Sequence, residues 1–328
     1  MALLEFTPNG IWCPEADVYI DPWKPVPKAL VTHGHSDHAR PGHGHYLCTE
    51  AAAPVIRHRL GAIRAQTIRF GEERTINGVQ FTFFPAGHIP GSAQIRVSRK
   101  GETWVVSGDY KVEPDRLSEA FEPIRCHTFI TESTFGLPVY RWQPQEAVFE
   151  EIAGWWRNNR AEGKISLLSA YALGKAQRII RNLDFSIGPV YVHGAVDVVN
   201  RILHRQGFEL PPTSAFTDDT PRQALEGSLI IAPPAALNSA WTRRFKNLST
   251  ATASGWMNIR GARRRRSVDR GFALSDHADW DGLNRAIRAT GAEQVFVTHG
   301  YTAIFAQWLR EQGLDAKEVR TEFGEEEV

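Results

Sequence analysis

The sequence has few cysteines, no long hydrophobic run and almost no net charge. Its three cysteines are scattered and never form a C-x-x-C pair: Cys13, Cys48 and Cys126. They argue against a disulfide framework and against a thiolate zinc site, so buried structural thiols are expected. No stretch of about eighteen uninterrupted apolar residues occurs, so we expect no transmembrane helix.

The N-terminal segment MALLEFTPNGIW lacks the basic start, long apolar run and small-residue cleavage site of a signal peptide. We therefore expect a cytoplasmic protein without a membrane partner. The net charge is only +1 over 328 residues, so affinity for a polyanion must come from local patches. The content of 42% hydrophobic and 23% charged residues is typical of a globular protein, and the length suits one large domain or two ordinary ones.

Short apolar runs bounded by turn residues predict buried strands. They are ADVYI, KALVT, FTFF, TWVVS, TFIT, ISLLSA, PVYVHG, SLIIAP and QVFVT. Helical periodicity predicts helices over about 143–160 and 174–183, and after Val196 and Asp279. Strand and helix alternate from residue 145 onward, which indicates a parallel sheet with covering helices, and the chain as a whole is mixed α/β with more than one sheet.

Five of the apolar runs end on a residue that can bind or orient a metal ion. These residues are Asp21, His33, His88, Asp109 and His299. Strand ends hold side chains rigidly, as a metal site requires. A single residue of this kind would be an ordinary strand-end residue, but five together indicate a site.

The strongest pattern is the H-x-H-x-D-H segment. Its residues are His33, His35, Asp37 and His38. Residues two apart in an extended segment project to the same side, so His33 and His35 can close on one metal ion. Asp37 and His38 would then turn toward a second ion. Imidazole and carboxylate ligands suit zinc or manganese, and the alternative is a polar loop that happens to be rich in histidine.

This motif resembles that of the metallo-β-lactamase superfamily, which binds two metal ions. The resemblance implies an αββα sandwich. It also implies that Asp21 in YIDPW orients the histidine loop, that His88 in AGHIPGSA is a further ligand and that Asp109 in SGDY bridges both ions.

The second half resembles the β-CASP nucleases of that superfamily. Glu132 in ITESTFG, His277 in LSDHADW and His299 in VTHGY match their motifs A, B and C. The resemblance implies an inserted α/β domain, so we expect a first lactamase part over 1–140, a β-CASP insert over 141–255 and a return over 256–328. SAYALGKAQ and SGWMNIRG resemble elements of the insert and of the return.

The resemblance also assigns roles. One ion would be held by His33, His35 and His88, the other by Asp37, His38 and His299, with Asp109 shared. A hydroxide activated by the two ions would attack phosphorus, and Asp37 would take its proton. His277 would protonate the leaving oxygen while Glu132 orients it, although a lone histidine there would more simply be a surface residue at a helix start.

The substrate class is less specified. Whole-sequence similarity to the bacterial DNA-ligase-associated exonucleases favours DNA, as an exonuclease in repair beside a ligase and a helicase. Motif C favours RNA, because the histidine at 299 occurs in RNA-cutting members such as RNase J and is missing from the eukaryotic DNA-cutting ones.

Two functions of other classes would share this fold. A small-molecule metallo-hydrolase would have the metal motif but would need neither the inserted domain nor the Glu132–His277 pair. A non-catalytic scaffold would have lost metal ligands, whereas every expected ligand position is filled here.

Several further residues are candidate substrate contacts. A basic run before motif B is either a phosphate-backbone track or a solvated loop, and consists of Arg260, Arg263, Arg264, Arg265, Arg266 and Arg270. Ser169 and Lys175 could reach a terminal phosphate, and Tyr171 could stack on a base. His43 and His45 form a second H-x-H on a glycine-rich turn, and we expect no metal ion there.

Overall fold

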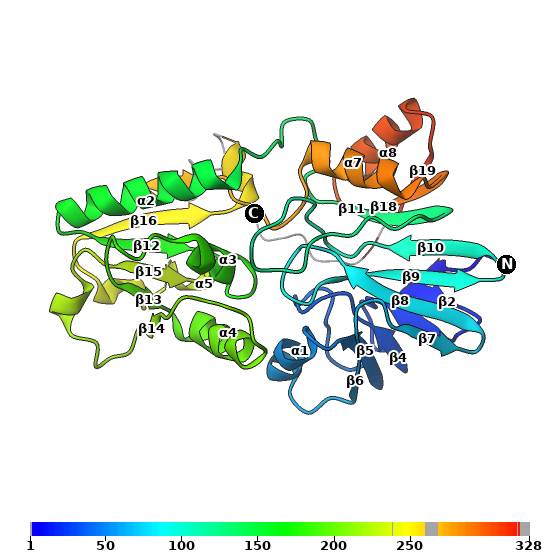
Figure 1. Cartoon of the computed structure of the whole chain (residues 1–328), viewed down its shortest axis with the longest axis horizontal. Helices are drawn as coiled ribbons and strands as arrows, with labels where there is room; N and C mark the ends of the chain where they lie inside the picture. Colours follow the sequence, from blue (N-terminus) through cyan, green and yellow to red (C-terminus); the bar gives the residue numbers. More distant parts are fainter. Residues whose placement is uncertain (1, 238, 260–267, 320, 322–328) are drawn as a thin grey trace. The chain divides into compact units, whose positions relative to one another are not determined.

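The structure is a computed structural model that describes residues 2–237, 239–259, 268–319 and 321. The chain divides into two compact units, which are described separately (Figure 1). The first unit takes the residues up to Pro114, then Ser118–Arg141, and the described residues from His277 onward. The second takes Asp115–Leu117 and the described part of Trp142–Asp276.

The first unit contains two sheets. The first has the order β1-β2-β3-β4-β5-β6 and consists of β1 (Glu5–Thr7), β2 (Gly10–Cys13), β3 (Val18–Ile20), β4 (Lys28–Leu30), β5 (His45–Thr49) and β6 (Ala65–Ile68). The second has the order β19-β18-β11-β10-β9-β8-β7 and consists of β7 (Glu73–Ile76), β8 (Val79–Pro85), β9 (Ala93–Arg99), β10 (Glu102–Val106), β11 (Thr128–Ser133), β18 (Gln294–Gly300) and β19 (Asp315–Glu318). Its helices are α1 (Ala53–Leu60), α7 (Trp280–Thr290) and α8 (Thr302–Glu311).

These elements pack as four layers because side chains of a strand alternate between its two faces. Leu30 joins the core shared by both sheets, to which Phe81 also belongs. Its neighbour Val31 points the other way, into a core that includes Ile56 of α1. On the far side of the second sheet, Phe129 packs in the core covered by α7 and α8. The layers of the first unit are therefore stacked in the order helix, sheet, sheet, helix.

The second unit is built on one parallel sheet with the order β14-β13-β15-β12-β16-β17. Its strands are β12 (Ile165–Ser169), β13 (Val190–Val192), β14 (Ser214–Ala215), β15 (Leu229–Ala232), β16 (Leu248–Ala253) and β17 (Arg270–Phe272). Among its described residues, the helices are α2 (Gln145–Ala161), α3 (Lys175–Asn182), α4 (Gly194–Arg205) and α5 (Pro234–Leu237), with the short 3₁₀ turns η1 (Arg222–Leu225), η2 (Thr242–Arg244) and η3 (Gly255–Asn258).

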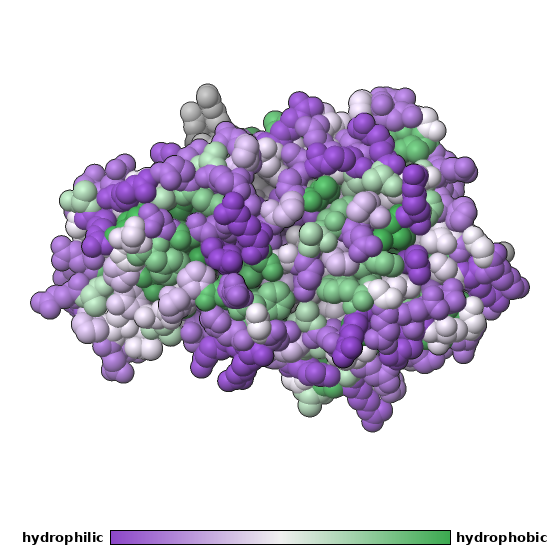
Figure 2. All heavy atoms as spheres, viewed as in Figure 1, coloured by the Kyte–Doolittle hydropathy of each residue, from purple (hydrophilic) through white to green (hydrophobic). Residues whose placement is uncertain are grey.

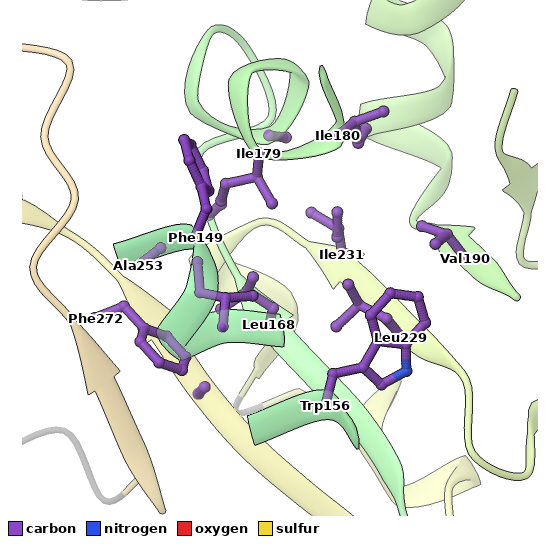
Figure 3. Close-up of a cluster of buried hydrophobic side chains, with 14 of the residues drawn as sticks. Phe149, Trp156, Leu168, Ile179, Ile180, Val190, Leu229, Ile231, Ala253 and Phe272 are labelled. Carbon is purple, nitrogen blue, oxygen red and sulfur yellow. The ribbon is translucent and has the colours of Figure 1, made fainter. Parts of the chain in front are cut away.

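Helices α2, α3 and α4 supply the core on one face of this sheet. Trp156 of α2 is fully buried there with Leu168 and Ile231, as Figure 3 shows, and its indole nitrogen donates to the carbonyl oxygen of Gly227 at 3.0 Å. Trp155, the adjacent residue, is only half-buried. Trp156 thus belongs to the core, and Trp155 to the edge, of the same helix.

The mixed α/β architecture predicted from the sequence is confirmed. Each of the predicted apolar runs contains a strand, and the four predicted helices correspond to α2, α3, α4 and α7. Helix α1 was not among the predicted helices. The second unit extends to Asp276, because β17 pairs with β16 and keeps that segment in the sheet of the second unit.

The buried and exposed residues follow the sequence expectations. The three cysteines are buried and reduced. Among the described residues, no helix is long and apolar enough to cross a membrane. Figure 2 shows hydrophilic residues over much of the visible face, with hydrophobic residues in separate patches.

We predict that Trp156→Ala destabilises the second unit by about 3–5 kcal/mol, because it removes a fully buried indole and leaves a cavity. Urea unfolding followed by circular dichroism measures the change. Arg157→Ala is the matched control, since that side chain on the same helix is 46% exposed, and we expect less than about 1 kcal/mol. Equal unfolding free energies for Trp156→Ala and the unsubstituted protein would contradict the assignment of this core.

Candidate metal centre

The predicted metal-site residues of the first unit converge at the ends of its strands. Asp21 follows β3, His33 follows β4, His88 follows β8 and Asp109 follows β10, while His299 lies near the end of β18. All five are buried. The strand ends therefore bring together residues that are far apart in the sequence.

The tightest group is formed by His33, His35, His88 and Asp109, whose candidate ligand atoms lie within 4.8 Å of one another. His88 Nε2 is 3.0 Å from His35 Nδ1. Asp109 Oδ2 is 3.4 Å from His33 Nε2 and 3.8 Å from His88 Nε2. This is the set that the resemblance assigned to the first ion.

A second group, His33, Asp37 and His38, has the same compactness. His38 Nε2 is 3.4 Å from Asp109 Oδ2 and 3.7 Å from Asp37 Oδ2. Asp109 thus faces histidines of both groups. His299, which was expected in this second set, lies with its ring centroid 6.5 Å from that of His38. It lines the same small cavity as His38 and Asp109, but it does not belong to the tight group.

Asp21 fixes the start of the histidine loop. Its Oδ1 accepts a hydrogen bond from the backbone nitrogen of Thr32 at 2.8 Å, and its Oδ2 accepts one from the Thr32 hydroxyl at 2.5 Å. The same Oδ2 lies 2.8 Å from His38 Nδ1. The contact at Nδ1 leaves Nε2 directed at Asp109, which is how a carboxylate orients a histidine ligand.

Two glycines allow the strand ends to approach. A side-chain carbon on Gly108, which has φ +55°, would lie 2.7 Å from Thr32. A side-chain carbon on Gly87, which has φ +75°, would lie 2.2 Å from the carbonyl oxygen of Lys111. Glycine tolerates both the positive φ and the close contact. The residues beside them, His88 and Asp109, can therefore reach the site.

His299 is placed by an irregularity in the sheet. The register of β11 and β18 shifts at Glu132 and Ser133, so that Ser133 pairs with Gly300. His299 itself has φ +55°, and the Ser133 hydroxyl donates to its carbonyl oxygen at 2.6 Å. Bulges and left-handed residues of this kind are common beside active sites, because they redirect a side chain.

Next to the metal-ligand groups, Glu132 and His277 form a buried pair. His277 Nδ1 is 2.9 Å from Glu132 Oε2 and 3.0 Å from Oε1. Glu132 also accepts hydrogen bonds from the backbone nitrogen of Tyr110 at 2.8 Å and from the Thr134 hydroxyl at 2.5 Å. Its carboxylate oxygens thus hold the imidazole in one orientation. Atoms of Asp109, Glu132 and His277 lie within 4.8 Å of one another.

The electrostatics of the cluster suit a cation. Burial, together with the charge of His38, holds the pKa of His33 well below its ordinary value. Burial opposes protonation of His38 as well, but the carboxylates of Asp109 and Asp37 raise its pKa well above the usual range. For Asp109, burial is outweighed by His38 and His33, which keep its pKa well below the usual range. A neutral His33 and an ionised Asp109 are the forms that bind metal.

The residues present therefore fit divalent metal ions. His33 Nε2 is buried, and no hydrogen-bond partner for it exists among the described residues. A buried imidazole nitrogen that faces other nitrogen and oxygen ligands calls for a cation. Imidazole and carboxylate together are a ligand set accepted by zinc and by manganese.

The predicted substrate contacts lie elsewhere in the chain. Ser169 ends β12 in the second unit and is buried, and its hydroxyl has no hydrogen-bond partner among the described residues. Lys175 begins α3, where its Nζ is 3.5 Å from Asp276 Oδ2 and 4.7 Å from the centre of the Tyr171 ring. The predicted contacts Arg260, Arg263 and Arg264, with their neighbours Arg265 and Arg266, lie outside the described residues.

Sequence reasoning missed the residues that position the functional ones. Thr32 engages Asp21, Thr134 engages Glu132, and Ser133 engages the backbone of His299. Each stands directly beside a motif residue, in VTHGH or in TEST. Their position next to a motif residue was the one indication in the sequence. It does not predict the contact, because a hydroxyl group beside a motif can form hydrogen bonds with many other groups.

The chain is similar to several longer proteins. No protein-family model matches it. Over 312 residues, 94% of the chain, it is 34% identical to a "Probable DNA ligase" from Opitutus terrae, of which the match covers 30%. Over 124 residues, 36% of the chain, it is 36% identical to endoribonuclease ysh1 of Aspergillus fumigatus, of which the match covers 14%.

A third relative is cleavage and polyadenylation specificity factor 73 of Drosophila melanogaster. It is 32% identical over 141 residues, 42% of this chain and 19% of that protein. The chain thus spans less than a third of the length of these curated relatives. A solved structure of a protein of unknown function from Enterococcus faecalis V583 shares the fold, with a TM-score of 0.61 and 10% identity over 91% of this chain and 80% of that one.

These relatives and the H-x-H-x-D-H site bear out the resemblance to the metallo-β-lactamase superfamily. They are also consistent with the resemblance to its β-CASP nucleases, to which Glu132, His277 and His299 had pointed.

We predict that the protein retains about two equivalents of zinc after loading and gel filtration. His33→Ala should lose at least one equivalent, because His33 belongs to both ligand groups. Mass spectrometry of the metal content measures this, with circular dichroism to check the fold. His45→Ala is the control, since His45 is exposed and lies outside both groups. Unchanged zinc in His33→Ala would contradict the assigned site.

Proposed function

We propose that this chain is a metal-dependent nuclease that hydrolyses phosphodiester bonds of nucleic acid, with DNA as its substrate. The observation that carries the proposal is the adjacency of two metal-ligand groups and the Glu132–His277 pair. We further propose that the four-layered first unit is the metallo-β-lactamase sandwich and the second unit the inserted β-CASP domain. A small-molecule hydrolase of the same fold would have no need of an oriented general acid beside its metal ligands.

The metal ions are assigned to the ligands as follows. His33, His35 and His88 would hold one ion, Asp37 and His38 with His299 the other, and Asp109 would be shared. When bound, two divalent cations, which we propose to be zinc with manganese as the alternative, activate water for attack on phosphorus and offset the charge of the phosphate.

The protein's own residues perform the proton transfers. Asp37 is 21% exposed, whereas the His38 side chain is 3% exposed, so Asp37 is the accessible carboxylate to accept the proton of the attacking water. Because Nδ1 of His277 contacts Glu132, we assign Nε2 to the leaving oxygen. A carboxylate beside an imidazole stabilises the protonated ring, which is the form a general acid needs. Asp21 keeps the histidine loop in place.

The choice of DNA rests on the relative that matches along most of this chain and is named a probable DNA ligase. We infer that the chain works as an exonuclease in DNA repair in association with a ligase and, by the family resemblance, a helicase. The proposed substrate contacts are Ser169, Tyr171, Lys175 and the arginine run before motif B, with Arg260, Arg263 and Arg264. RNA is the second candidate, because the ysh1 and factor 73 relatives include an endoribonuclease and because His299 is present.

We predict that the protein shortens 5′- or 3′-labelled single-stranded DNA stepwise and leaves RNA of the same sequence intact. The label lost first gives the polarity. Asp37→Ala, which removes the proposed proton acceptor and a metal ligand, should show no hydrolysis. Rapid cleavage of RNA with little cleavage of DNA would overturn the DNA assignment, and full activity in Asp37→Ala would overturn the metal mechanism.

For His277→Ala we expect a loss of about 10²–10⁴ in kcat with the metal content unchanged, because only the proton donor is removed. Steady-state kinetics and metal analysis of the same preparation measure both quantities. His204→Ala, on the outer part of α4, is a histidine control that should keep its activity. A loss of metal in His277→Ala would instead make His277 a ligand.

A further inference from the structure

The backbone around His277 is anchored on both sides. The chain passes from the second unit to the first between Asp276 and His277. On the later side, the backbone nitrogen of Ala278 donates to the carbonyl oxygen of Tyr110 at 2.7 Å. On the earlier side, Ser275 and Asp276 are both buried. His277 thus directly follows residues that are buried within the second unit and directly precedes a backbone hydrogen bond within the first.

Arg178 of α3 provides the earlier anchor. Its Nη1 donates to the carbonyl oxygen of Ser275 at 2.5 Å and to Asp276 Oδ1 at 3.2 Å. Its Nη2 donates to the side-chain oxygen of Gln145 at 3.0 Å. The side chains of Arg178 and Asp276 are each 3% exposed. A guanidinium donates several bonds in a fixed fork, so it can hold a carbonyl and a carboxylate at once.

A second buried cation completes the arrangement. Lys175 lies one turn before Arg178 on α3, and its Nζ is 3.5 Å from Asp276 Oδ2. Both carboxylate oxygens of Asp276 therefore face a cation. A buried ion pair is weak evidence for a stabilising role, because the cost of removing water from the charges offsets much of the attraction. A role in fixing geometry explains better why two cations face one carboxylate beside His277.

We propose that Arg178 is a positioning residue for His277. This rests on the proposed nuclease function, in which His277 protonates the leaving oxygen. Peptide units are planar, so fixing the Ser275 carbonyl and the Asp276 side chain leaves few rotations before His277. A catalytic group must be held to within about 0.5 Å, and an error of about 1 Å can cost about 10² in rate.

The test compares two leaving groups. A dinucleotide releases an alkoxide that needs a proton, whereas a nucleotide p-nitrophenyl phosphodiester releases a phenolate that leaves without one. For Arg178→Met we expect kcat to fall about 10- to 100-fold on the dinucleotide and less than about 3-fold on the p-nitrophenyl ester. The KM and the metal content should not change. Arg178→Lys keeps the positive charge but not the guanidinium group, so it should show a smaller difference between the two substrates in the same direction. This variant replaces Arg178→Met in the test if Arg178→Met does not fold.

Arg181→Met is the matched control. It lies one turn further along the same helix, its side chain is 37% exposed, and it faces Glu209 at 3.8 Å. Both substrates should be hydrolysed at the original rate. His277→Ala sets the reference pattern. One outcome overturns the positioning role alone. In it, the loss of kcat in His277→Ala depends on the leaving group, but the Arg178 variants lose kcat equally on both substrates. If His277→Ala also loses kcat equally on both substrates, the assignment of His277 as the general acid fails, and this inference fails with it.

Discussion

The candidate metal site of the first unit depends on keeping an ionised carboxylate, Asp109, buried among imidazoles. Its Oδ2 lies 3.4 Å from His33, 3.4 Å from His38 and 3.8 Å from His88. A buried charge of this kind is tolerated only where opposite charge or a metal ion is close. The packed sheets satisfy this condition, because the ends of their strands hold the histidines at fixed positions around the carboxylate.

Local irregularities then convert a regular scaffold into a site. The positive φ of Gly87 and Gly108 lets two loops approach closely, and the register shift between β11 and β18 redirects His299. Around these, short polar side chains such as Thr32 and Thr134 fix the carboxylates that orient the histidines. The carboxylates of Asp21 and Glu132 are thus held by hydrogen bonds from Thr32 and Thr134, which lie at or next to the ends of strands.

The second unit contributes through the chain that leaves it. Arg178 and Lys175 hold Asp276, and the next residue is His277, which Glu132 orients from the first unit. In the proposed function this parallel α/β unit is the source of substrate contacts, and its residue Asp276 directly precedes the proposed general acid in the chain. Asp276 and His277 are neighbours in the segment SDHAD, where the chain passes from the second unit to the first.

The sequence by itself determined the strands with apolar runs and the principal helices, because periodicity is a local property. The family resemblance, and not local spacing alone, supplied His88 and Asp109 as companions of His33 and His35, and the structure places these four residues close together. Periodicity missed α1, whose apolar face is short. Only the tertiary structure decided that Asp109 faces both ligand groups, that His299 stands apart from the tight second group, and that Lys175 is paired with Asp276. These are contacts between residues distant in the sequence, and no local pattern encodes them.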